Sequence, residues 1–201
     1  MKTFSGLGVS AGIGQAPALL VEPAPGLPAR DPKGDTDDDV ARVTAALSKV
    51  ADRLDARALE ADPSAIGVLM ATAMMARDPG LTSSVRTHLE EGDGPAHALW
   101  GAIDDFCAQL TAAGGYLAER VTDLHNVRDR ALAVLQGLPE PGVPAFDSPV
   151  ILVAEDLAPA DTATLDPELV RGLVTAAGGP TSHTAILAAQ IGIPAVVRCP
   201  G

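Results

Sequence analysis

The segment GGPTSH, residues 178–183, holds the most closely spaced chemically useful side chains of this sequence. Its two glycines permit a tight turn, and Thr181 and Ser182 are residue types that cap the start of a helix. His183 then falls in the first helical turn, where free backbone N–H groups and the helix dipole disfavour a protonated imidazole. A neutral imidazole is a nucleophile, and the same N–H groups bind phosphate. The spacing therefore suits a histidine that accepts a phosphoryl group.

A second interpretation stays open, because a strand followed by Gly-Gly, a capping residue and a helix is a common arrangement. In that case His183 is an ordinary surface residue. His88, His97 and His125 lie in helical stretches without this context, and we expect surface or packing roles for them. No HExxH, Walker P-loop or GxSxG motif occurs. The acidic run 37–39 is typical of a first helical turn, and we predict no metal site.

The composition is that of a folded, acidic protein. Of its 201 residues, 47% are hydrophobic and 2% aromatic, so Ala, Val, Leu and Ile must build the core. The net charge of −12 argues against nucleic acid and anionic membranes as partners, because both require a basic surface, but it suits a basic protein. We expect Cys107 and Cys199 to be reduced thiols. Without a signal peptide or membrane helix in view, we expect a soluble, cytoplasmic protein.

The middle of the chain is predicted to be helical. Residues 35–37 offer an N-cap to a first helix, and a second helix is expected to end near Asp78-Pro79. A third is expected to end at Gly92, and a long segment over 95–136 to be broken or bent at Gly114-Gly115. One apolar stripe at spacings of three and four marks the first helix: Val40, Val43, Leu47, Val50 and Leu54. Helical stretches with short connections predict a bundle.

The hydrophobic pattern changes in the last quarter of the chain. Short apolar runs at 150–154, 169–175 and 194–197 predict buried strands, with a helix at 182–190 between the last two. This alternation of strands and helices predicts a parallel sheet. At the other end of the chain, residues 6–21 predict two short strands around a turn.

Two proline-rich segments separate these regions. We predict a discontinuous α/β domain with an inserted helical domain, because isolated N-terminal strands need a sheet to join. A helical domain followed by a separate α/β domain is the alternative. The predicted boundaries are 1–22 and 146–201 for the α/β domain, 33–138 for the helical domain, and 23–32 and 139–145 for the linkers.

The string GGPTSHTAILAAQIGIPAVV resembles the phosphohistidine signature of Enzyme I of the bacterial sugar phosphotransferase system, the phosphoenolpyruvate–protein phosphotransferase. Three further segments are similar to the same family: GLGVSAGIGQA at 6–16, YLAERVTDLHNVRDR at 116–130 and VILVAEDLAPADTATL at 150–165. The likeness covers nearly all of the chain. It implies a swivelling phosphohistidine α/β domain with an inserted helical bundle that docks the phosphocarrier HPr.

The resemblance also implies roles for individual residues. His183 becomes the phosphoryl carrier, phosphorylated on Nε2, and Thr162 matches the threonine whose hydroxyl holds the other ring nitrogen. From the sequence alone, Thr162 is equally well a helix cap after a proline. Thr181, Ser182 and Thr184 are expected to cap the helix or to line the phosphate.

Four residues of the helical block are expected to contribute to partner binding. Met70 and Met74 lie on the second helix, which forms part of the HPr-docking surface in the family. Arg120 and Asp123 match polar positions of the bundle that face the active helix; a solvated helix face with i,i+3 pairing is the alternative. The family often has Glu-x-His where Met70 and Thr72 stand here, and Arg198-Cys199-Pro200 replaces its usual small residues after the last strand.

The family continues beyond this length with further strands, a linker helix and a phosphoenolpyruvate-binding barrel. The resemblance therefore implies an N-terminal portion whose α/β domain is incomplete at its C-terminal end. Mg²⁺ and phosphoenolpyruvate are expected in the barrel of the full-length enzyme, with no cofactor on this chain. We expect this chain to be monomeric, the full-length enzyme dimeric, and the isolated chain to exchange phosphoryl groups with HPr only.

Two other functions are the alternatives. One is the Enzyme-I-like portion of a dihydroxyacetone-kinase phosphotransferase subunit. The other is a non-catalytic module that only binds a phosphocarrier. The presence of His183 together with Thr162 argues against the second.

Overall fold

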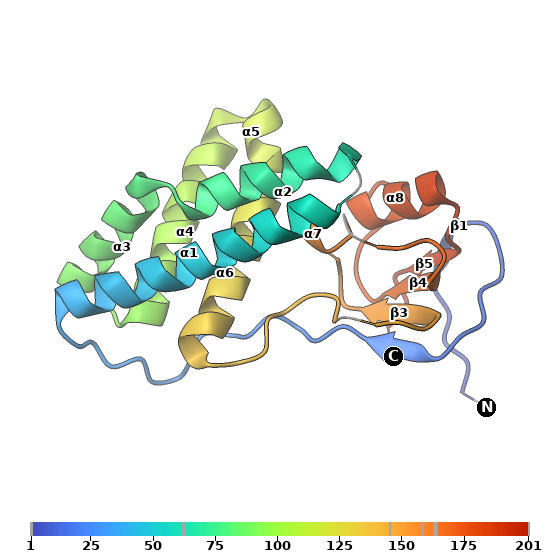
Figure 1. The fold of residues 1–201 in the computed structure, drawn as a ribbon, viewed down its shortest axis with the longest axis horizontal. Coiled ribbons are helices and arrows are strands. Elements are labelled where there is room, and N and C mark those ends of the chain that lie inside the picture. The colour runs from blue at the N-terminus through green and yellow to red at the C-terminus, as the bar shows by residue number, and fades with distance from the viewer. Residues whose placement is uncertain (1, 62, 145, 158, 163–164, 201) are drawn as a thin grey trace. The chain divides into compact units, whose positions relative to one another are not determined.

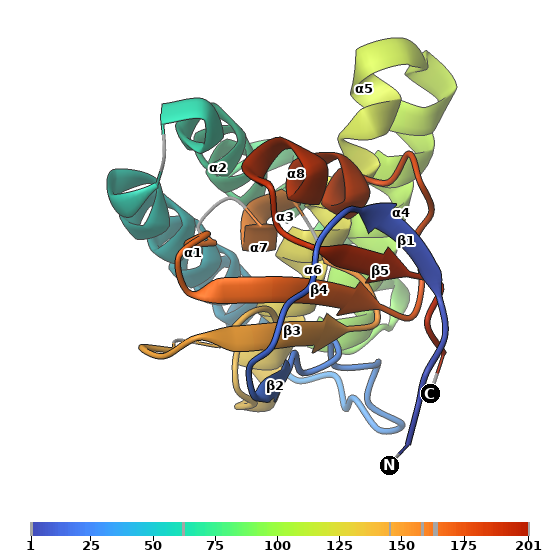
Figure 2. The same ribbon diagram turned by 90° about the vertical axis from the view of Figure 1, so that its right-hand side faces the viewer.

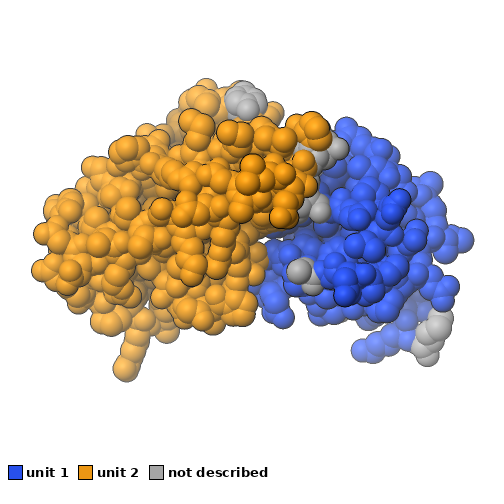
Figure 3. All heavy atoms as spheres, in the orientation of Figure 1, with its two compact units in different colours: residues 1–23, 142–201 blue, residues 24–141 orange. Residues whose placement is uncertain are grey.

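The computed structural model describes residues 2–61, 63–144, 146–157, 159–162 and 165–200. The chain divides into two compact units, which Figure 3 colours separately. One unit joins residues 1–23 to residues 142–201, and the other comprises residues 24–141. Both ends of the chain therefore belong to the same unit, and the helical unit is inserted between them.

The helical unit begins with α1, Thr36–Glu60. Asp35 caps this helix, and its Oδ1 accepts hydrogen bonds from the backbone N–H groups of Asp37, at 2.9 Å, and Asp38, at 3.2 Å. These bonds satisfy N–H groups that have no partner inside the helix. The predicted apolar stripe is buried along its whole length, from Val40 to Leu54. Both the cap and the stripe are therefore confirmed.

Three helices follow: α2, Pro63–Ala76; α3, Pro79–Glu91; and α4, Pro95–Ala113. Asp78 caps α3 at its start, and Gly92 ends it with φ at 119°. The cap position of α4 is Gly94, which has no side chain, and the carboxylate of Asp31 accepts from the backbone N–H of His97 at 2.8 Å instead. A residue of the proline-rich segment thus helps to start α4.

The long helical segment is broken where two glycines were expected to break it. Gly114 and Gly115 have φ angles of 71° and 54°, which glycine adopts without strain. The short α5, Gly115–Glu119, and then α6, Val121–Gln136, follow the break. In this unit α1 packs against α2, α3, α4 and α6 (Figure 1).

The other unit is built on a sheet with the strand order β1-β5-β4-β3-β2 among the described strands. The strands are β1, Leu7–Ser10; β2, Ala18–Leu20; β3, Val150–Ala154; β4, Val170–Thr175; and β5, Ala195–Val197. The pairs β3–β4 and β4–β5 are parallel, as the alternation of strands and helices predicted, and β2 also pairs with β3 in the parallel sense. The sheet is mixed, however, because β1 pairs with β5 in the antiparallel sense.

The two N-terminal strands lie on opposite edges of this sheet rather than beside each other (Figure 2). The connection between them passes close to β4 at Gly14, where an added Cβ atom would overlap the backbone carbonyl of Arg171. A glycine is therefore required at this crossing. The sequence predicted both strands but gave no signal for their separation, which depends on this backbone approach.

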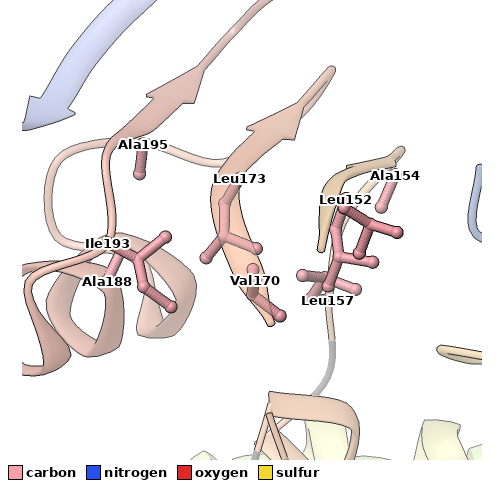
Figure 4. Packing of buried hydrophobic residues seen from close by; sticks show 9 residues of the cluster. Leu152, Ala154, Leu157, Val170, Leu173, Ala188, Ile193 and Ala195 are labelled. Carbon is pink, nitrogen blue, oxygen red and sulfur yellow. The ribbon is translucent and has the colours of Figure 1, made fainter. Parts of the chain in front are cut away.

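Buried residues of β3, β4 and β5 form the core of the α/β unit together with residues in and near α8. Leu152, Val170 and Leu173 are buried together with Ala188 of α8, His183–Ile191, and with Ile193, which follows α8 in the sequence (Figure 4). Helix α8 packs against β1 and β5, and also against the short α7, Pro159–Thr162. The sheet thus fixes the place of α8, the helix that begins at His183.

Among the described residues, no helix combines the length and the apolar character needed to cross a membrane.

Candidate functional site: the turn before helix α8

Helix α8 begins within the GGPTSH segment. Ser182 is the cap residue, with φ at −66° and ψ at 154°, and its hydroxyl accepts from the backbone N–H of Ala185 at 3.3 Å. His183 is the first residue of the helix, and its side chain lies outside the described part of the structure. Thr181 precedes the cap and is exposed. The backbone of His183 therefore occupies the end of the helix that carries partial positive charge.

The glycine pair makes a turn that folds against this cap. Gly178 has φ at 86°, and an added Cβ atom there would lie 3.3 Å from the hydroxyl oxygen of Ser182. The backbone N–H of Ser182 donates to the carbonyl of Gly179 at 3.0 Å. The conformation at 178 and the nearness of Ser182 both favour glycine at this position.

Neighbouring strand ends hold the start of the turn on both sides. Ala176 and Ala177 donate their backbone N–H groups to the carbonyls of Ala154, at 3.0 Å, and Glu155, at 2.8 Å, at the end of β3. On the other side, the carbonyl of Thr175 accepts from the N–H of Cys199 at 3.0 Å, just after β5. These bonds tie the start of the turn to the ends of β3 and β5.

Thr184 anchors the first turn of α8 to the rest of the unit. It is 1% exposed, and its hydroxyl donates to the backbone carbonyl of Leu157 at 3.4 Å. Ala185 beside it is also buried. Within the described structure, the hydroxyl of Thr184 thus serves the contact between α8 and the segment after β3.

Thr162 is brought close to the same helix. It is the last residue of α7, it is 3% exposed, and α7 packs against α8. Its backbone carbonyl accepts from the N–H of Leu165 at 3.3 Å. The fold therefore places Thr162 and the start of α8 on neighbouring elements of one unit, although 20 residues separate them in the sequence.

The residues considered for partner binding lie in the helical unit. Met70 and Met74 are exposed on α2, at 51% and 72%, and none of the 14 residues of α2 is charged. Thr72 between them is fully buried and donates to the carbonyl of Val68 at 2.9 Å. The exposed side of α2 is thus apolar, which is unusual for a solvated helix face.

Arg120 and Asp123 form an ion pair at the junction of α5 and α6. Their Nη1 and Oδ2 atoms lie 2.9 Å apart, and the side chains are 17% and 5% exposed. The i,i+3 pairing considered from the sequence is present, but the pair is largely buried rather than solvated. It braces the place where α6 begins.

Family models match most of the chain. Residues 5–120 match the N-terminal domain of PEP-utilising enzymes, and residues 146–201 match the mobile domain of PEP-utilising enzymes. The chain belongs to the PEP-utilising enzymes.

Individual relatives of this PEP-utilising enzyme agree with that assignment. The phosphoenolpyruvate-protein phosphotransferase of Streptomyces coelicolor is 46% identical over 205 residues, which cover 99% of this chain and 36% of that protein. The protein of the same name from Lactococcus lactis subsp. lactis is 34% identical over 96% of this chain and 35% of its own length. The chain thus spans about a third of the length of the curated relatives it matches.

Solved structures agree with the fold. A solution NMR structure of Enzyme I superposes with a TM-score of 0.82 at 29% identity, covering 98% of this chain and 82% of that one. An N-terminal domain of Enzyme 1 – Nitrogen gives 0.62 at 23% identity, over 98% and 84%, which supports the fold alone. The resemblance to Enzyme I and the α/β-plus-helical fold class are therefore confirmed.

The other histidines of this PEP-utilising enzyme lie in the helical unit. Nε2 of His88 lies 3.0 Å from a carboxylate oxygen of Asp105, and Nδ1 lies 3.4 Å from one of Asp93. The hydrogen bond to Asp105, with help from Asp93, raises the pKa of His88. Burial, together with the nearby Arg128, lowers the pKa of His125. Among the described residues, no three His, Cys, Asp or Glu side chains gather closely enough to hold a metal ion.

Two features of the structure were not singled out from the sequence. The buried Arg130 donates to Asn126 at 2.9 Å and pairs with Glu140, which also pairs with Arg53. Arg198 was noted only as a departure from the family, yet its side chain bonds to the turn before α8. Arg130 follows Asn126 at the i,i+4 spacing, which could have indicated that pair. No local pattern links Arg198 to residue 178.

Proposed function

We propose that this chain performs the phosphohistidine steps of a phosphoenolpyruvate–protein phosphotransferase. His183 accepts a phosphoryl group and passes it to a histidine of the phosphocarrier HPr, in the first step of sugar uptake by the phosphotransferase system. The observation that carries this proposal is the glycine turn and the Ser182 cap that place His183 at the start of α8. The 46% identity to a protein named for this activity supports it.

In this mechanism the protein positions groups and stabilises charge rather than supplying further covalent chemistry. The neutral imidazole of His183 attacks phosphorus through Nε2; the new P–N bond forms as the P–N bond of the donor histidine breaks. Thr162 holds the other ring nitrogen, Nδ1, and so selects which nitrogen attacks. The first backbone N–H groups of α8 favour the transferred dianion.

The two hydroxyl residues beside His183 have supporting roles in this proposal. Ser182 caps α8 and keeps its first turn in place. Thr184 anchors that turn to Leu157. Thr181, which is exposed before the cap, is assigned to the phosphate side of the turn.

Phosphoenolpyruvate and Mg²⁺ are assigned to the barrel of the full-length enzyme. Among the described residues of this chain, no three ligand side chains are clustered for a metal ion. Binding of Mg²⁺ in the barrel would supply charge neutralisation for the phosphoenolpyruvate phosphate. This chain would then receive the phosphoryl group on His183.

The docking surface for HPr is proposed to include the exposed side of α2. Met70 and Met74 offer it flexible apolar contact area. The net charge of −12 attracts a carrier whose active site is basic. The Arg120–Asp123 pair keeps the start of α6 in place on the same unit. We further propose a cytoplasmic, monomeric chain that binds neither nucleic acid nor membranes.

The test is phosphoryl transfer from phosphorylated HPr to the purified chain. We expect one phosphoryl group that is labile in acid and stable in base, and no label in His183→Ala. His97→Gln, which changes a partly exposed histidine of the helical unit, is the matched control and should label normally. Full labelling of His183→Ala would reject the assignment, and binding of HPr without transfer would favour the non-catalytic module.

A second arm tests the donor. With phosphoenolpyruvate and Mg²⁺ alone we expect no labelling, and labelling should appear when full-length enzyme is added. Efficient labelling without full-length enzyme would place a phosphoenolpyruvate site on this chain and contradict its assignment to the barrel.

A further inference from the structure

Arg198 has an unusual backbone for its residue type. Its φ is 52°, and among the described residues it is the one non-glycine residue with a positive φ. A side chain in this left-handed region is strained, and such strain persists only where surrounding contacts maintain it. The N–H of Cys199 donates to Thr175, and Gly6 is packed so tightly against Cys199 that an added Cβ would lie 2.8 Å from its Cβ. These contacts hold residues 198 and 199 in place.

The strained backbone directs Arg198 onto the turn before α8. Its backbone N–H donates to the carbonyl of Ala177 at 3.4 Å, and Nε of its guanidinium donates to the carbonyl of Gly178 at 3.2 Å. An ideal Cβ at Gly179 would lie 3.5 Å from Nη2, so the guanidinium rests against the second glycine as well. The carbonyl of Gly179 in turn binds the N–H of Ser182, the residue before His183.

The guanidinium retains donors for a further acceptor. Of the three guanidinium nitrogens, Nε donates to a protein acceptor. Within the described part of the chain, Nη1 and Nη2 have no acceptor. Arg198 is exposed, so these groups are accessible. A planar guanidinium binds phosphoryl oxygens through two parallel N–H donors, which makes it suitable for a dianionic phosphoryl group.

The charge of Arg198 is distinctive in this unit. The described acidic residues of residues 1–23 and 142–201 outnumber the cations, which are Lys2, Arg171 and Arg198. Arg171 lies four residues before the end of β4, about 13 Å back along the strand from the turn. Arg198 is therefore the cation that the fold bonds to the glycine turn.

We propose that Arg198 is a positioning residue for the phosphorylated state of His183, an inference that rests on the proposed function. Its Nε holds the Gly178 carbonyl, and its remaining charge favours the phosphoryl group on the histidine that follows the turn. The chain takes its phosphoryl group from phosphorylated HPr in a reversible exchange. The charge of Arg198 shifts this equilibrium toward the phosphorylated chain. Loss of the charge then shifts that equilibrium back toward phosphorylated HPr.

The test measures this equilibrium constant and the phosphorus NMR titration of the phosphoryl group in a series at position 198. Arg198→Gln is expected to lower the equilibrium constant about fivefold, the size of an exposed ion pair, with a smaller difference at high salt. It should also raise the pH at which the phosphoryl group titrates. Arg198→Lys keeps the charge and should retain most of both properties. Arg171→Gln is the control and should change neither.

A purely structural role is separated by two further measurements. Arg198→Gly relieves the strained φ, so it should lower the thermal unfolding temperature only slightly. It should nevertheless lower the equilibrium constant by the same factor as Arg198→Gln. Equal behaviour of the Lys and Gln variants, or an unchanged titration in Arg198→Gln, overturns the inference while labelling of His183 stands. If the unaltered chain takes no phosphoryl group, the proposed function fails and this inference falls with it.

Discussion

In the helical unit, carboxylate side chains bind the N-terminal ends of three helices: Asp35 caps α1, Asp78 caps α3, and Asp31 reaches the start of α4. In the α/β unit, the turn before α8 is fixed mostly by backbone groups, through the N–H groups of Ala176 and Ala177 and the N–H of Cys199. Backbone bonds tie the start of this turn to the ends of the adjacent strands.

The same contrast appears in how each unit treats charge. The helical unit buries Arg130 beside Glu140 and Asn126. The α/β unit keeps Arg198 exposed, at the edge of a turn that presents helix N–H groups. Removing one partner of a buried charge pair is costly, whereas an exposed charge is available to a ligand. We therefore expect substitutions in the two units to affect different properties.

The largest expected effect is on the stability of the helical unit. Arg130→Met removes a buried charge from its carboxylate and amide partners and should lower the free energy of unfolding by about 3 kcal/mol. Arg53→Met removes the more exposed partner of the same Glu140 and should cost less than about 1 kcal/mol. Urea titration measures both. Equal losses would show that burial of Arg130 does not decide the energetics.

The α/β unit should instead be sensitive to a single added methyl group on the backbone. Gly14→Ala places a Cβ on the backbone carbonyl of Arg171, which cannot move away as a side chain could. This substitution should lower the free energy of unfolding by about 2–3 kcal/mol. Gly8→Ala, in β1, meets nothing within 4 Å and should change stability by no more than about 1 kcal/mol. Thermal unfolding of the two variants compares them, and a Gly14→Ala protein as stable as Gly8→Ala would refute the crossing argument.

A substitution of Thr162 tests whether this residue serves phosphoryl transfer or only the stability of the α/β unit. If its hydroxyl orients the ring of His183, Thr162→Val should slow single-turnover phosphoryl transfer about threefold to tenfold, because one neutral hydrogen bond is lost at nearly constant shape. Thr111→Val, which removes a hydroxyl bonded to the Cys107 carbonyl in α4, should leave the rate unchanged. A normal rate with a lowered unfolding temperature in Thr162→Val would make Thr162 a helix cap.

The smallest expected effect is a pH dependence confined to the helical unit. The pKa of His88 is raised in the folded state by Asp105 and Asp93. The interaction of protonated His88 with these carboxylates therefore stabilises the fold, and its contribution is fully present below the ordinary histidine pKa near 6.5. That contribution is lost as the pH rises through the folded-state pKa. It should be about 0.2–1 kcal/mol, as for a partly exposed ion pair. His88→Gln should remove this slope from unfolding curves taken between pH 6 and 8 (roughly the range of histidine titration), and an unchanged slope would assign it to another group.

Periodicity and local residue types predicted most of the helices and strands. The stripe from Val40 to Leu54, the glycine break at 114 and the cap at Ser182 each depend on residues close in sequence. The mixed sheet did not follow from such patterns, because β1 and β2 join opposite edges through a backbone approach at Gly14. Long-range pairing of this kind leaves no periodic signal in one sequence.

Some features of the candidate site could also be predicted from the sequence, and others could not. The turn and cap around His183 could be predicted because they lie within six residues. The buried place of Thr162 on α7 beside α8 and the bond from Arg198 to Gly178 join residues about 20 apart. Only the resemblance to Enzyme I suggested the first, and nothing in the sequence indicated the second.

The location of the phosphoryl group tests the role of His183 as the phosphoryl carrier. The chain is mixed with phosphorylated HPr, quenched in base and mapped by peptide mass spectrometry. We expect one phosphoryl group per chain, on the peptide that contains His183. A phosphoryl group on the peptides of His88, His97 or His125, or none on any peptide while HPr remains charged, would contradict it.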